Sequence, residues 1–295
     1  MKVFKMGLVP LWYKIKARYL TKDAEMDNIA STKGAYEYLK RYRQNVEVIG
    51  HNDEVTEHYD EPIRYWTCWL QGEENAPKIV QACLKSMRKY LGMSRLTLLT
   101  SENIKDYVSV PDYINDKYER GLISCTHYSD IVRLLLLEQY GGIWIDSTIL
   151  MTGIMPEIIE TSPFFVYKWP VRGKICLASN FIAAKPHYPI IKYTLGMILD
   201  YWKVENRLVS YSLIHLAMTH ASEAYPKLWS NIPYIPGELE YLMNYRFNDD
   251  YTEEGFKKLC DMTSIHKLTY KTEQFKIDTK KKGSFYDFVC NNLYK

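Results

Sequence analysis

Short apolar runs alternate with amphipathic stretches along residues 62–224, and this pattern predicts an α/β fold. The short runs are rich in β-branched and aromatic residues, which favours strands. The predicted strands are residues 63–69, 95–100, 143–145, 164–168 and 180–184. The predicted helices are residues 78–91, 112–120, 126–140, 189–202 and 210–220. Strands that alternate with helices indicate a mixed, mostly parallel sheet flanked by helices.

Glycines end two of these helices and lead to a candidate ligand site. Gly92 follows the helix at residues 78–91, and Gly141-Gly142 follows the helix at residues 126–140. A short apolar strand comes next, and Asp146 follows it directly. Ligands of open α/β sheets bind beyond the carboxyl ends of strands. We therefore predict that Asp146 faces a ligand, with Thr148 on the same face if the chain stays extended.

The first 60 residues differ from the rest. Residues 1–22 carry six Lys or Arg side chains and no acidic one, among many aromatic and aliphatic residues. This mixture suits an anionic membrane surface, although an ordinary helix packed on the main domain is the alternative, and Pro10 interrupts any long helix. Residues 23–60 read as helical to about Arg43 and then as a polar linker. We therefore divide the chain into an N-terminal helical, basic and aromatic extension, residues 1–60, and one domain, residues 61–295.

Composition excludes several classes of protein. The net charge is only +3, so composition does not indicate a nucleic-acid partner. No apolar run approaches the roughly 18 residues of a membrane-spanning helix, and the N-terminus lacks the pattern of a secretory signal. The six cysteines are scattered without a C-x-x-C pair, which favours reduced thiols. We expect a cytoplasmic protein that lies peripherally on the inner face of the cell membrane.

Candidate chemistry begins at the N-terminal end of the helix at residues 126–140. Ser129 and Arg133 are four residues apart and Asp130 and Arg133 three apart, so all three lie on one surface. A carboxylate accepts hydrogen bonds from sugar hydroxyls and a guanidinium donates several. Mg²⁺ and Mn²⁺ often bridge a carboxylate such as Asp146 to substrate phosphates. The alternatives are a solvated helix ion pair for Asp130 and Arg133, and a turn residue for Asp146.

Other motifs argue against further enzyme classes. His215 and His220 are five residues apart and lack the H-E-x-x-H spacing, so we interpret them as core or surface histidines. The sequence has no P-loop, no G-x-G-x-x-G after a strand and no G-x-S-x-G elbow. It therefore shows no signature of a P-loop nucleotidase, a dinucleotide enzyme or an α/β-hydrolase.

Two blocks around Asp146 resemble a known family. Ser129-Asp-Ile-Val-Arg133 and Tyr140-Gly-Gly-Ile-Trp-Ile-Asp-Ser-Thr148 resemble the DXD-containing sugar transferases, in particular the bacterial capsular polysaccharide synthesis glycosyltransferases. Residues 66–77, 179–185 and 266–271 resemble the first strand, a middle strand and the C-terminal motif of that family. The resemblance spans about residues 62–271. It implies a GT-A fold, which is the nucleotide-diphospho-sugar transferase fold, and the transfer of a sugar from a nucleotide donor.

The resemblance also implies roles for individual residues. Trp66 and Trp69 would line the pocket for the nucleotide base. Ser129, Asp130 and Arg133 would bind the donor sugar, and Asp146 would contact the ribose or a metal. His266 would approach the metal, and Lys267 and Lys271 would face phosphate. Asn180 would lie near the acceptor or the anomeric carbon, which makes Asp130, Asp146 and Asn180 the predicted catalytic residues.

The chain departs from the family pattern at two places. Related D-x-D enzymes have a second carboxylate where this chain has Thr148, and a hydroxyl is a poorer ligand for a divalent metal. Ser210-Tyr211 stands where the resemblance leads us to expect Asp-Tyr. We still expect Mn²⁺ or Mg²⁺, bound by Asp146 and His266.

The full prediction is a metal-assisted, retaining glycosyltransferase of capsular or exopolysaccharide biosynthesis. Its donor would be a UDP-sugar and its acceptor a lipid-linked saccharide or oligosaccharide, with residues 1–22 on the membrane surface. There are two alternatives. One is a non-catalytic sugar-nucleotide-binding or scaffold subunit of an assembly complex, which the loss of a metal ligand at Thr148 supports. The other is a protein that binds only anionic lipid.

Overall fold

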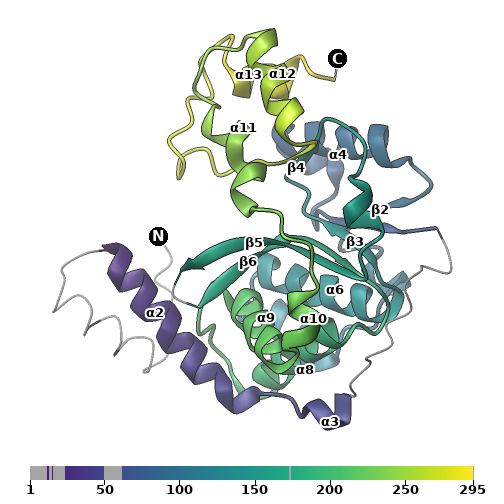
Figure 1. Ribbon diagram of the computed structural model, residues 1–295, viewed down its shortest axis with the longest axis vertical. Coiled ribbons are helices and arrows are strands. Elements are labelled where there is room, and N and C mark those ends of the chain that lie inside the picture. The colour runs from purple at the N-terminus through teal and green to yellow at the C-terminus, as the bar shows by residue number, and fades with distance from the viewer. Residues whose placement is uncertain (1–11, 13–14, 16–23, 50–61, 173, 295) are drawn as a thin grey trace.

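The computed structural model describes residues 24–49, 62–172 and 174–294, together with residues 12 and 15 (Figure 1). The central sheet has five strands in the order β2 (Leu96–Leu99), β1 (Tyr65–Cys68), β3 (Gly142–Ile145), β6 (Ile175–Ala184) and β5 (Phe164–Arg172). β1 pairs in parallel with β2 and β3, whereas β6 is antiparallel to both β3 and β5. Four of these strands therefore run in one direction and β6 is reversed, which confirms the mostly parallel sheet.

Helices cover both faces of the sheet, as the alternating pattern predicted. α6 (Cys125–Tyr140), α8 (Pro189–Val204) and α9 (Leu213–Ala224) lie on one face, and α4 (Lys78–Leu91) lies on the other (Figure 1). Each face has its own hydrophobic core. β1 and β3 are buried on both sides, as is most of β6, which explains why these strands read as continuous apolar runs.

The predicted strands and helices match these elements to within a few residues. β5 and β6 extend further than residues 164–168 and 180–184, and they pair with irregular register beyond Val166. Among the described residues from position 62 onward, the remaining elements are β4 (Ile149–Met151), β7 (Ile265–Lys267), α5 (Asp112–Glu119), α7 (Glu157–Glu160), α10 (Pro226–Ser230), α11 (Leu242–Tyr245), α12 (Glu253–Met262), α13 (Phe285–Asn291) and three short 3₁₀ turns. β4 and β7 pair antiparallel as a separate ribbon.

The glycine pair after α6 has a steric reason. Gly142 has a φ of 99°, and a Cβ there would lie 2.4 Å from the Arg64 carbonyl oxygen and 3.0 Å from Trp66 Nε1. Only glycine combines this backbone conformation with such close approach. Trp66 Nε1 in turn donates a hydrogen bond of 2.9 Å to the Gly141 carbonyl oxygen. The pair therefore brings α6 tightly back into the sheet and sets the start of β3.

The described part of the N-terminal extension is attached to the main core. α2 (Ala24–Leu39) is followed by a 3₁₀ turn and by α3 (Val46–Ile49). The ring of Tyr36 stacks on His220 of α9 with centroids 4.0 Å apart, and its hydroxyl contacts Glu223. Residues 1–22, which we assigned to a membrane surface, lie outside the described residues apart from positions 12 and 15. Among the residues that the structure describes, no helix has the length and apolarity needed to cross a bilayer.

Candidate functional site

Asp146 lies where the sequence pattern placed it, at the carboxyl edge of the sheet. It directly follows β3, and Trp69 directly follows the neighbouring parallel strand β1. The Asp146 backbone N–H donates a hydrogen bond of 2.8 Å to the Asn180 carbonyl oxygen on β6, which fixes the point where the chain leaves the sheet. Three strands thus bring Trp69, Asp146 and Asn180 to the same edge, as is typical of ligand sites in α/β folds.

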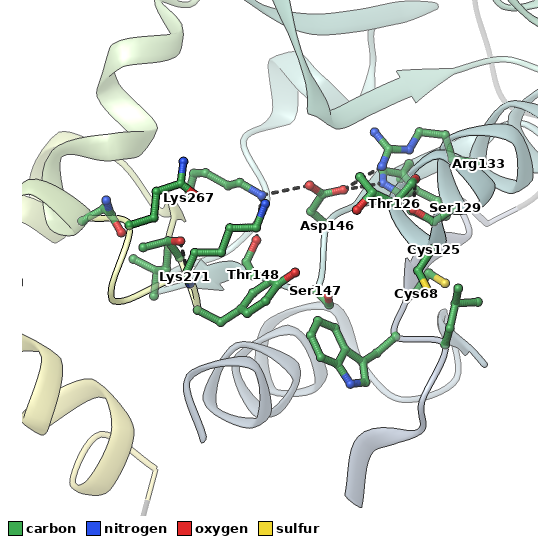
Figure 2. Close-up of a pocket in the computed structure, with 18 of the residues that line it drawn as sticks. Cys68, Cys125, Thr126, Ser129, Arg133, Asp146, Ser147, Thr148, Lys267 and Lys271 are labelled. Carbon is green, nitrogen blue, oxygen red and sulfur yellow. Dashed lines mark hydrogen bonds and ion pairs between the residues drawn. The ribbon is translucent and has the colours of Figure 1, made fainter. Parts of the chain in front are cut away.

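Two cations hold the Asp146 carboxylate, and we call Asp146, Arg133 and Lys267 the Asp146 cluster. Arg133 Nη2 lies 3.1 Å from Oδ1, and Lys267 Nζ lies 2.9 Å from Oδ2 (Figure 2). Trp144 Nε1 donates a further hydrogen bond of 2.9 Å to Oδ1. Lys267 also donates a bond of 2.6 Å to the hydroxyl of Thr148. The residue that departs from the family pattern therefore positions an ammonium group.

The ion pair of Arg133 and Asp130 is buried inside the protein, so it is not the solvated helix pair that the sequence left as an alternative. The Arg133 side chain is only 4% exposed and lies 3.1 Å from Asp130 Oδ1. Its Nη1 donates to the Ser179 carbonyl oxygen, and its guanidinium lies 4.7 Å from the centroid of the Trp144 ring. Arg133 thus ties together α6, β3 and β6 beneath the site.

Burial and charge move the pKa values of the two aspartates in opposite directions. Burial alone would raise the pKa of Asp146, but Lys267 and Arg133 outweigh it, so that this pKa is lowered. Burial raises the pKa of Asp130, and Arg133 opposes it only in part. Asp146 is consequently the firmly ionised member of the pair.

Two cavities meet at the Asp146 cluster. The first, of about 410 Å³, is lined by Trp69, Ser129, Thr148 and Lys271 besides the cluster, and Figure 2 shows Lys267 and Lys271 on one side of Asp146 with Ser129 and Arg133 on the other. The second, of about 460 Å³, lies toward Asp130 and Asn180. Both volumes are in the range of small-molecule sites. The residues that line both cavities are Thr126, Arg133, Asp146, Tyr211, Tyr241 and Lys267.

Two predicted site residues are placed elsewhere, and both assignments need correction. Trp66 is fully buried against Tyr107 and Tyr140 and lines neither cavity, because it lies two residues before the end of β1, inside the core on that face of the sheet. Trp69 lies past the strand end and does line the first cavity. His266 is fully buried on β7, where its Nε2 lies 3.1 Å from the Thr152 hydroxyl oxygen. Because Lys267 faces Asp146, the adjacent His266 faces away from it.

The residues at the site do not fit a divalent metal. Asp146 is the sole carboxylate of the first cavity among the described residues, and three donors already bind it. Asp130 pairs with Arg133, and burial lowers the pKa of His266 to about 4 with its ring turned away. Within the described part of the chain, no three His, Cys, Asp or Glu residues form a group suited to a metal ion. The assistance of Mn²⁺ or Mg²⁺ stays a prediction from the sequence, and this donor set disfavours it.

The structure adds residues that sequence reasoning missed. Tyr211 lines both cavities although its neighbour Ser210 breaks the family pattern. His215, which we interpreted as a core or surface histidine, lines the second cavity. Glu240, fully buried, accepts a hydrogen bond of 2.7 Å from Asn180 Nδ2. Burial raises the pKa of Glu240 to about 8. No sequence signal marks this pair, because its members are 60 residues apart.

We expect Glu240→Gln to change how stability depends on pH. The pKa of Glu240 is about 8 in the folded protein against 4.5 ordinarily, so the neutral acid's contribution is complete below about pH 4.5 and is lost as the pH rises to 8. The free energy of unfolding of the variant, relative to that of wild type, should therefore rise by a few kcal/mol from pH 5 to pH 8. Urea denaturation at both pH values measures this. The exposed control Glu102→Gln should follow wild type, and an equal pH profile for Glu240→Gln would contradict the prediction.

The fold and the site together define an α/β protein with two adjoining cavities at the carboxyl edge of its sheet. A family profile described as "Capsular polysaccharide synthesis protein" matches residues 19–289. The chain therefore belongs to the capsular polysaccharide synthesis protein family. This match covers both cavities and includes the Asp146 cluster.

The chain is also similar to characterised glycosyltransferases. It is 29% identical over 157 residues to O-glycosyltransferase braB of Annulohypoxylon truncatum, a match that covers 46% of this chain and 37% of that protein. The chain thus spans little more than a third of that relative's length. Among solved structures, PaToxG glycosyltransferase aligns over 98% of this chain and 96% of its own with 12% identity and a TM-score of 0.37. A transferase double mutant aligns over 56% of this chain and 85% of its own, with 10% identity and a TM-score of 0.33. The family assignment rests on the profile match over residues 19–289.

Proposed function

We propose that the protein transfers a sugar from a nucleotide-sugar donor, namely a UDP-sugar, to a saccharide acceptor in capsular or exopolysaccharide synthesis. The observation that carries this proposal is the Asp146 cluster at the wall shared by two cavities. The family membership and the glycosyltransferase relative support the same reaction class. The lipid-linked acceptor and the membrane surface contacted by residues 1–22 remain part of the proposal.

The donor would occupy the first cavity. Asp130 lines only the second cavity, so in this proposal it would not bind the donor sugar, as the resemblance implied. Trp69 and Tyr270 form an edge-to-face pair there with centroids 5.3 Å apart, which offers an aromatic surface to a base. Trp69 Nε1 is buried and has no hydrogen-bond partner among the described residues, so a ligand oxygen would satisfy it. Lys267 and Lys271 place two ammonium groups in the same cavity, which suits a diphosphate.

The transfer step needs positive charge at the leaving group. The anomeric carbon forms a bond to an acceptor hydroxyl oxygen, and its bond to the diphosphate oxygen breaks with the electron pair. In a retaining front-face reaction the departing diphosphate takes the hydroxyl proton, so no enzyme nucleophile is required. We assign Lys267 to the neutralisation of this diphosphate, with Asp146 and Thr148 as the groups that position its ammonium.

Nucleotide binding provides the first test. We expect Trp69→Ala to weaken UDP binding, measured by calorimetry, by about 5- to 150-fold, because base stacking contributes about 1–3 kcal/mol. The matched control is Tyr234→Ala, an aromatic residue that is 65% exposed and lines neither cavity. A screen of nucleotide sugars for release of nucleoside diphosphate identifies the donor. Wild type that binds no nucleotide and hydrolyses no donor would reject the enzyme and favour a scaffold role.

A further inference from the structure

The second cavity adjoins the first, so it could hold a second substrate beside the one bound in the first cavity. Six residues line both cavities, with the Asp146 cluster among them. Molecules in the two cavities would therefore meet at this shared wall. Group transfer requires that the reacting atoms of two substrates approach at one point.

The chemistry of the second cavity is neutral and hydroxyl-rich. Away from the shared wall, Asp130 is the sole charged lining residue among those described, and Arg133 pairs with it. The rest of the polar lining consists of amide, hydroxyl and imidazole groups from Asn28, Thr32, Ser179, Asn180, Ser212 and His215. Such groups suit sugar hydroxyls, which both donate and accept hydrogen bonds, and offer no additional cation to a phosphate.

His215 supports a ligand in this cavity. Its Nε2 lies 3.2 Å from the Ser179 hydroxyl, while its Nδ1 is buried with no hydrogen-bond partner in the described part of the protein. A buried polar atom without a partner is costly, and a ligand hydroxyl would remove that cost. Burial lowers the pKa of His215 to about 4, so the ring is neutral at pH 7.

An aromatic platform faces the same space. Trp169 lines the second cavity and packs edge-to-face with Tyr241, with centroids 5.4 Å apart. A Cβ at Gly237 would lie 2.7 Å from the Trp169 ring, so the backbone there holds the ring from behind. An aromatic ring with a fixed orientation binds the apolar face of a sugar without losing side-chain freedom.

A further part of the wall comes from α2. Asn28, Ile29 and Thr32 line the cavity, and α2 is joined to α9 by the stack of Tyr36 on His220. The ion pair of Arg43 and Glu223, at 3.0 Å, lies close to that stack and strengthens the join. Because α9 also carries His215, the two parts of the wall are fixed relative to each other.

We infer that the second cavity binds the acceptor as an uncharged saccharide unit, and that α2 forms the wall that selects it. The inference rests on the proposed function, because it takes the first cavity as the donor site. It assigns to the described part of the N-terminal extension a role in acceptor choice.

Blocking the cavity from α2 tests this inference. Asn28 is exposed on α2, so Asn28→Trp fills the cavity with little cost to packing. We expect binding of methyl glycosides, followed by saturation-transfer NMR, to weaken at least tenfold, and transfer to them to fall in parallel. UDP binding and hydrolysis of the donor by water should stay within twofold of wild type. The matched control is Lys33→Trp, at an exposed position of the same helix outside both cavities.

The outcomes separate this inference from the proposed function. UDP binding together with unchanged glycoside binding in Asn28→Trp would overturn the acceptor site alone. Wild type that prefers hexuronic acids or sugar phosphates over methyl glycosides, or binds none of them, would also overturn it. Loss of glycoside binding in Asn28→Trp with retained UDP binding supports it. Absence of UDP binding in wild type would instead reject the donor site.

Discussion

Arg133→Met should lower the free energy of unfolding by about 3–5 kcal/mol, the range for removing one partner of a buried ion pair. The side chain is 4% exposed and lies between Asp130 and Asp146, each 3.1 Å away. Its removal leaves the buried Asp130 carboxyl group without a cation and Asp146 with Lys267 alone, and it also frees the Ser179 carbonyl oxygen. Urea denaturation at pH 7 with linear extrapolation measures the loss.

An arginine in an exposed ion pair between residues one helical turn apart provides the control. Arg120 lies 2.9 Å from Asp116 at i,i+4, with side chains 60% and 57% exposed, so Arg120→Met should cost about 0.5 kcal/mol or less. Adding Asp130→Asn to Arg133→Met should restore part of the stability, because one unpaired carboxylate disappears. Equal losses for Arg133→Met and Arg120→Met would show that the cluster is not a structural tie.

Lys267→Met should lower donor turnover about 10²- to 10³-fold, the usual effect of removing one preorganised group that stabilises developing charge. The ammonium is held by Asp146 at 2.9 Å and by Thr148 at 2.6 Å, so it is already in place when the diphosphate departs. The loss should therefore appear mainly in kcat, with a smaller change in KM. Release of nucleoside diphosphate from the donor provides the assay.

The same assay decides between the ammonium and a metal ion. Lys203→Met, at an exposed pair with Asp200, should match wild type. Wild-type turnover should persist in EDTA. Asp146 is already bound by two cationic side chains, and Thr148 stands where a second carboxylate would be needed to bind a metal. Full activity of Lys267→Met together with complete loss in EDTA would assign the charge neutralisation to a divalent metal instead.

The local pattern of the sequence was enough to predict the sheet and its helices. The predicted strands, of three to seven residues, and the helix at residues 126–140 were correct, because the central strands are buried on both faces and α6 ends at Gly141. The position of Asp146 followed from the same pattern, since a residue directly after a parallel strand lies at the ligand edge. Sequence spacing also brought Ser129, Asp130 and Arg133 together on α6, because one helical turn joins them.

Tertiary structure decided what those residues contact. Lys267 reaches Asp146 across 121 positions of the sequence because β7 pairs with β4, and alternation along β7 turns His266 the other way. Nothing in the motif distinguishes these two neighbours until the register of the ribbon is known. Trp66 and Trp69 likewise separate into core and cavity only because β1 ends between them.

The sequence by itself thus determined the α/β fold, the carboxyl-edge position of Asp146 and the resemblance to capsular polysaccharide glycosyltransferases. The burial of Arg133, the ammonium between Asp146 and Thr148, and the second cavity walled by α2 depend on contacts between distant segments. Periodicity along the chain reports which face of an element is buried, but long-range packing chooses the partner of each polar group. For this reason the fold was readable from the sequence, whereas the chemistry of the site required the structure.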